Sequence, residues 1–96
     1  MLIRQAIVTK YIGPSNVRGS RIKASAAAGS VTLHYDSSLN TEDNHAKAAK
    51  ALADKYEWSG AWYQGGMPDD SGYCFVCVDS RYDRDNLPVF ATLGKV

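Results

Sequence analysis

The fold is decided by one stretch, Thr41-Glu-Asp-Asn-His-Ala-Lys-Ala-Ala-Lys-Ala-Leu-Ala-Asp-Lys-Tyr-Glu-Trp58, which predicts the only long helix of the chain. Asn40 or Thr41 can cap its start by accepting a hydrogen bond from a backbone amide that has no partner within the helix. Glu42 and Asp43 then place negative charge at the positive end of the helix dipole. The rest of the chain is expected to form short strands around this helix.

One face of the predicted helix carries small or apolar side chains. It comprises His45, Ala49, Leu52 and Tyr56, with Ala48 and Ala53 at its edges. Because alanine side chains are short, this face can lie close against a sheet. Leu52 and Tyr56 are expected to fill most of the space between this face and the sheet.

The residues before the helix predict three strands. Leu2 to Tyr11 is rich in β-branched residues and apolar on both faces, which is typical of a strand near the middle of a sheet. Residues 21–25 and 31–35 alternate between apolar and polar side chains around a turn at Gly29, which predicts a hairpin. Its solvent face would carry Arg21, Lys23, Thr32 and His34.

Two more strands are predicted after the helix, at Trp58 to Gln64 and Tyr73 to Val78. The second is apolar at every position, which suits a strand covered on both faces. Val89 to Leu93 could add a short edge strand after Pro88.

The order βββαββ predicts an α+β fold, a two-layer sandwich of an antiparallel sheet with the helix across one face. Residues 1–96 should form a single domain, with 79–96 as a loosely attached tail or an edge strand. One helix covers only one sheet face, so the tail or a second copy would have to cover the other. A homodimer through that face is therefore a further expectation.

Cys74-Phe-Val-Cys77 matches the C-x-x-C spacing of zinc and redox sites. A structural zinc site needs four ligands, and this chain offers one pair and two widely separated histidines. Redox pairs normally open a helix, whereas positions 74 and 77 of a strand point to opposite faces. We interpret both as core cysteines and expect neither a metal nor another cofactor.

The two histidines, His34 and His45, lack the neighbours that nucleophilic catalysis requires. A catalytic pairing would need a nucleophile and an acid that orients the ring, and no serine lies in a nucleophile-elbow sequence. We therefore expect a protein that is not an enzyme. Catalysis with His45 as the base is the weakest of three hypotheses.

Charge is distributed unevenly along the 96 residues, although the formal net charge is only +1. The first 35 residues hold five basic side chains and no acidic one, and the remainder is acidic. No stretch has the roughly 18 apolar residues of a membrane span, and the N-terminus lacks the pattern of a signal peptide. We expect a cytoplasmic protein without a membrane partner, which also suits two reduced cysteines.

The basic loop and hairpin predict contact with nucleic acid. Arg18, Arg21 and Lys23 are the expected phosphate contacts, and Tyr11 is the expected stacking residue. Glycines at positions 13 and 19 would allow the backbone of the loop to approach the nucleic acid closely. The other interpretation is a solvated hairpin whose charges only keep the sheet edge from aggregating.

A second hypothesis directs the protein to a protein partner. Exposed aromatic residues and an acidic segment would form its surface, with Trp62, Tyr63, Asp79, Asp83 and Asp85 as contacts. Such acidic side chains can mimic nucleic-acid phosphate toward a basic host protein. A solvated acidic surface is the simpler alternative.

Several phrases resemble a group of small uncharacterised proteins encoded by bacteriophages, plasmids and integrated mobile elements. They are Thr9-Lys-Tyr-Ile-Gly-Pro-Ser-Asn-Val-Arg-Gly-Ser-Arg-Ile-Lys-Ala24, Asn44-His45-Ala46 with Ala48-Ala49, Trp58-Ser-Gly60 and Gly72-Tyr73. The resemblance covers residues 8–78 in separated patches. It implies a bacterial host cell, and an accessory protein that binds nucleic acid or blocks a host defence system in an anti-CRISPR-like manner.

Overall fold

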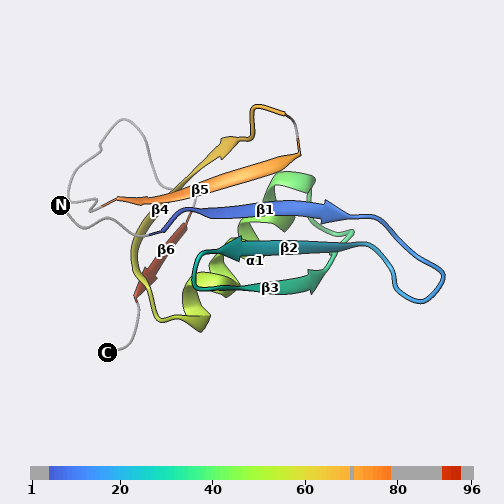
Figure 1. Ribbon diagram of the computed structural model, residues 1–96, viewed down its shortest axis with the longest axis horizontal. Helices are drawn as coiled ribbons and strands as arrows, with labels where there is room; N and C mark the ends of the chain where they lie inside the picture. The colour runs from blue at the N-terminus through green and yellow to red at the C-terminus, as the bar shows by residue number, and fades with distance from the viewer. Residues whose placement is uncertain (1–4, 70, 79–89, 94–96) are drawn as a thin grey trace.

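The structure is a computed structural model that describes residues 5–69, 71–78 and 90–93. The described residues form one helix and six strands, arranged as a sheet with the helix against it (Figure 1). Their bounds are β1 Ile7–Ile12, β2 Arg21–Ala26, β3 Gly29–His34, α1 Thr41–Lys55, β4 Ser59–Gly66, β5 Gly72–Val78 and β6 Phe90–Leu93.

The six strands form one antiparallel sheet in the order β3-β2-β1-β5-β4-β6. Helix α1 crosses one face of it (Figure 1), which confirms the predicted α+β fold. Strand β1 lies between β2 and β5, in the interior position that its apolar residues predicted. The short β6 pairs with β4 at one edge, where the sequence suggested an edge strand.

The helix begins as its capping sequence predicts, and it ends earlier. The Asn40 side chain accepts a hydrogen bond from the Asp43 amide at 2.7 Å. Tyr56 is the C-cap, and Glu57 adopts a left-handed backbone with φ of 57°, so the helix stops at Lys55 instead of reaching Trp58. A left-handed residue cannot continue a right-handed helix.

Asn44 joins the helix to the loop that precedes it. Its buried amide group donates to the carbonyls of Asp36 and Asn40 at 2.9 and 3.0 Å and accepts from the Asp36 amide at 2.7 Å. These bonds satisfy backbone groups that the loop would otherwise leave unpaired. Nothing in the sequence pattern singled out this residue.

The buried face of α1 carries mostly small side chains, as predicted. Leu52 is its only large aliphatic residue. Its buried residues are Asn44, His45, Ala48, Ala49, Leu52 and Ala53. The sheet supplies the bulk of the core with Ile7, Ile22, Trp62 and Phe75. Tyr56, expected on the buried face, is only half-buried, and its hydroxyl donates to the Ala28 carbonyl at 3.0 Å.

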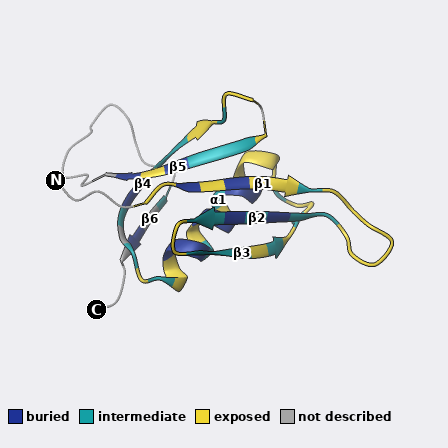
Figure 2. Cartoon of the chain, in the orientation of Figure 1, coloured by how far each residue is buried: buried dark blue, intermediate teal, exposed yellow. Residues whose placement is uncertain are grey.

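The other face of the sheet is open over the described residues (Figure 2). Val8 on β1 and Val76 on β5 project from it and remain 37% and 43% exposed. The prediction that β5 is covered on both faces is therefore wrong within the described structure. Cys77 points into the core and Cys74 is partly exposed on the open face, so the two cysteines do lie on opposite sides.

Strands β1 and β5 approach each other closely at Gly72. A Cβ atom added there would overlap the backbone carbonyl of Thr9, which cannot move aside without disturbing the pairing of the two strands. An added Cβ at Gly65 on the neighbouring strand would meet no atom within 4 Å.

We expect Gly72→Ala to lower the free energy of unfolding by about 1–3 kcal/mol, because the new methyl group forces the two strands apart. Gly65→Ala is the matched control and should leave stability unchanged or raise it slightly, since it also restricts the unfolded chain. Urea denaturation measures both. Equal stability of the two variants would contradict this account of the strand contact.

Candidate functional site

The open sheet face carries a group of basic side chains over β1, β2 and β3. Strand pairing sets Lys10 directly opposite Lys23, and it sets Arg21 opposite His34. We call these four residues the basic strip. Arg21, Lys23, Thr32 and His34 share one face of the hairpin, as the alternation of the sequence predicted.

The arrangement of the basic strip lowers the stability of the fold. Like charges directly opposite each other on neighbouring strands are destabilising, and Lys10 faces Lys23. Within the described residues, none of its members forms an ion pair with an acidic group. The ion pairs between described residues lie at α1 and its entry loop: Lys47–Asp36 and Lys50–Asp54.

The Arg21 guanidinium offers a further sign that the strip lacks a partner. Its Nε atom is buried and has no hydrogen-bond partner among the residues that the structure describes. A buried donor without an acceptor is unfavourable, and an anion bound to the guanidinium would relieve the charge repulsion nearby. The strip is therefore suited to anionic groups.

Arg18 lies in the loop between β1 and β2, which projects beyond the end of the sheet (Figure 1). Ser15 closes the tip of this loop: its amide donates to the Arg18 carbonyl at 2.7 Å, and its hydroxyl accepts from the Arg18 amide at 3.1 Å. Arg18 is exposed at this turn. The loop leads directly into β2, so the predicted phosphate contacts Arg18, Arg21 and Lys23 lie close together in the sequence.

Tyr11 does not join Arg21 and Lys23 on the open face. It pairs with Ile22 and projects from the helix side of the sheet. Its hydroxyl lies 2.7 Å from the Ser20 hydroxyl, and its ring contacts Tyr35 edge to face at 5.9 Å. The expectation that Tyr11 stacks a base beside the basic side chains of the hairpin does not match this placement.

Trp62, one of the residues assigned to a protein partner, is not available at the surface. It is fully buried, and its indole nitrogen donates to the Thr92 hydroxyl at 3.0 Å, so the expected exposure of this ring is wrong. It lies in a row of aromatic rings between Trp58 and Phe90. Tyr63 does project from the open face, where it is half-buried.

The acidic segment of the protein-directed hypothesis, Asp79, Asp83 and Asp85, lies outside the described residues.

Lys10 is a functional candidate that the sequence pattern did not assign to the site. It has the same parity in β1 as Val8 and Ile12, which places it with Val8 on the open face. Its position beside Lys23 depends on the register of β1 with β2. That register could not be read from alternation alone.

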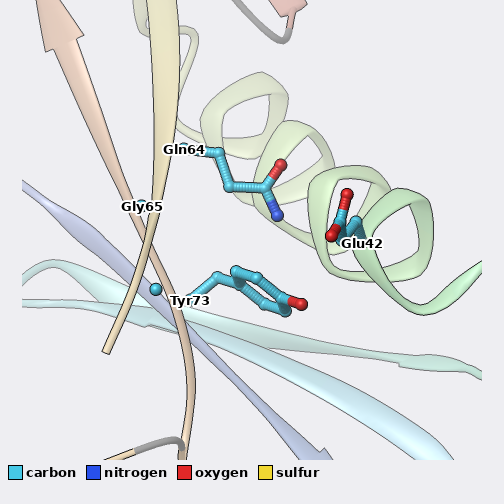
Figure 3. A pocket seen from close by; sticks show the side chains of 5 residues that line it. Glu42, Gln64, Gly65 and Tyr73 are labelled. Atoms are coloured by element: carbon cyan, nitrogen blue, oxygen red, sulfur yellow. The ribbon is translucent and has the colours of Figure 1, made fainter. Parts of the chain in front are cut away.

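A polar hollow opens on the helix side of the sheet, near the start of α1. It comprises two neighbouring lobes, of about 190 and 200 Å³, that share Gly66 and Tyr73 as lining residues. Figure 3 shows the first lobe, where Gln64 and Tyr73 reach from the sheet toward Glu42 on the helix. The first is lined by Glu42, Gln64, Gly65, Gly66 and Tyr73, and the second by Tyr11, His45, Gly66, Ser71, Gly72 and Tyr73.

His45 lies between this hollow and the core and links α1 to β1. Its Nδ1 atom is 2.7 Å from the hydroxyl of Thr9, and the Tyr73 ring contacts it edge to face at 4.7 Å. Burial away from water lowers the pKa of His45 below its usual value of 6.5. Among the described residues, no carboxylate is hydrogen-bonded to the ring in a way that would orient it for catalysis.

Comparisons of the chain with protein-family models, with curated proteins and with solved structures found no match. Within the described residues, no helix is long and apolar enough to cross a membrane.

We expect the stability of the protein to fall as the pH is lowered through about 6.5, because the unfolded chain then binds a proton at His45 that the folded chain resists. The contribution of the neutral ring is complete above this pH and is lost below it. Urea denaturation at about pH 7.5 and about pH 5 measures the decrease.

His45→Asn should reduce this pH dependence, whereas His34→Asn, on the exposed face, should retain it. The same pH dependence in both variants would show that the ring of His45 does not couple protonation to folding.

Proposed function

We propose that the protein is a small, non-enzymatic binding protein of a phage or mobile element that contacts nucleic acid through the basic strip and the Arg18 loop. The observation that carries the proposal is the juxtaposition of Lys10, Lys23 and Arg21 on one open sheet face, without an acidic partner among the described residues. Opposed like charges are retained at a cost to stability, and a polyanion would offset that cost.

The geometry suits a phosphate backbone more than a single anion. Lys10 and Lys23 lie on adjacent strands, Arg21 lies at the start of β2, and Arg18 in the preceding loop extends the cationic surface beyond the sheet. Long, flexible basic side chains spread in this way can follow successive phosphates and release their counterions. Tyr63 lies on the same face and is the aromatic side chain available there for stacking.

The alternative, an inhibitor of a bacterial defence system, stays a hypothesis about Tyr63 and the acidic segment. It predicts stable association with a host protein and no affinity for nucleic acid. The two proposals are therefore separated by the binding assay below.

The expected result is salt-sensitive binding of labelled single- or double-stranded oligonucleotides, measured by fluorescence anisotropy at about 50 and 200 mM salt. Lys10→Gln with Lys23→Gln should weaken binding for all sequences. The slope of log affinity against log salt should fall by about two, because each lysine that is neutralised no longer displaces a counterion from a phosphate.

Lys47→Gln with Lys50→Gln is the matched control, because it removes the same charge from the exposed side of α1. It should retain both affinity and slope. Absence of binding at low salt, or equally weakened binding in the two double variants, would refute the basic strip as the binding surface.

A further inference from the structure

The geometry points to a second element of recognition: we propose that the polar hollow beside Tyr73 binds an unstacked guanine base. This inference rests on the proposed function, since the base would belong to a nucleic acid held by the basic strip. It adds sequence preference to a surface that would otherwise read only phosphates.

Two tyrosine rings, those of Tyr11 and Tyr73, are among the groups that line the hollow. Gly66 lines both lobes and lies on the same sheet face as Gln64 and Tyr73. A Cβ atom added at Gly66 would meet no atom within 4 Å, so the missing side chain leaves room that no neighbour fills. Tyr73 and Tyr11, a residue that is 48% exposed, line this room, and their rings can stack against a planar base.

Two polar groups line the first lobe, and neither has a partner among the residues that the structure describes. The Nε2 atom of Gln64 is buried and has no hydrogen-bond partner among the described residues. Figure 3 shows its amide directed toward Glu42, whose carboxylate forms no ion pair with any described residue. A donor and an acidic acceptor therefore face the same space.

Guanine matches this pair better than the other bases. Its N1–H and N2–H groups are adjacent donors that a carboxylate can accept together, and its O6 atom beside them can accept from an amide. Adenine and cytosine each offer one amino donor next to an acceptor nitrogen, which would face the carboxylate unfavourably. Glu42 would thus accept from N1–H and N2–H of guanine while Gln64 donates to O6.

The hollow lies at the end of the sheet from which the Arg18 loop projects. Tyr11 lines the hollow and bonds through its hydroxyl to Ser20, which immediately precedes Arg21. Lys10 of the basic strip pairs with Gly72, which lines the second lobe. A strand held by the strip and the loop can therefore place one base over the end of the sheet into the hollow.

The test compares oligothymidylates of one length in which a single central position is guanine, hypoxanthine or adenine. Fluorescence anisotropy should rank them in that order, with guanine preferred to adenine by about tenfold. Hypoxanthine should be intermediate because it lacks the N2 amino group. Glu42→Gln should remove the preference and retain the affinity for plain oligothymidylate.

Asp43→Asn is the matched control, since it removes the same charge from the same helical turn but does not line the hollow. It should keep the preference for guanine. Gly66→Val should fill the hollow and also remove the preference, with plain oligothymidylate bound as before. Equal affinity for guanine and adenine in the unmodified protein would refute the inference and leave the basic strip intact.

Failure of all oligonucleotides to bind would instead refute the proposed function. Binding of free guanosine would then test the hollow separately. Guanosine is titrated into the protein while the NMR resonances of the Gln64 side-chain amide are recorded. These resonances should shift in the unmodified protein and not in Gly66→Val. No shift, or an equal shift with adenosine, would refute a guanine site.

Discussion

The structure depends on how closely α1 can approach the sheet. Ala48, Ala49 and Ala53 present little more than backbone to the strands, so the large side chains of the core come almost entirely from the other layer. A larger residue at one of these positions would push the helix away from Trp62 and Phe75 and open voids around both. The same short distance lets His45 reach the hydroxyl of Thr9 across the layer boundary.

Close packing on one side leaves the other side of the sheet available. Along each strand the side chains alternate, so the residues that do not meet the helix necessarily share the opposite face. On β4 and β5 that face is weakly apolar, with Tyr63, Cys74 and Val76. On β1 and β2 it carries Lys10, Arg21 and Lys23, so the character of this face changes from one half of the sheet to the other.

The helix, the hairpin and the antiparallel topology were predictable because each rests on local chemistry: a cap, a run of alanines, a period of two. The errors arose where both faces of a strand are apolar. In β4, Trp62 and Tyr63 are adjacent aromatic residues, and nothing local shows which of them meets the helix. Tyr11 was misplaced for a related reason, since its separation from Arg21 becomes visible only when the register of β1 with β2 is known. The hollow could not be foreseen at all, because it combines β1, α1, β4 and the residues around the start of β5.

The connection between β1 and β2 has a consequence for how such a protein can diversify. These two strands are hydrogen-bonded neighbours, yet residues 13–20 join them in place of a tight turn. The entropy of closing a loop rises by only about 0.6 kcal/mol for each doubling of its length. Insertions, deletions and exchanges of charge at this tip should therefore leave the pairing of the strands unchanged. The sequence of this loop can therefore change while the sheet and the helix that pack the core stay the same.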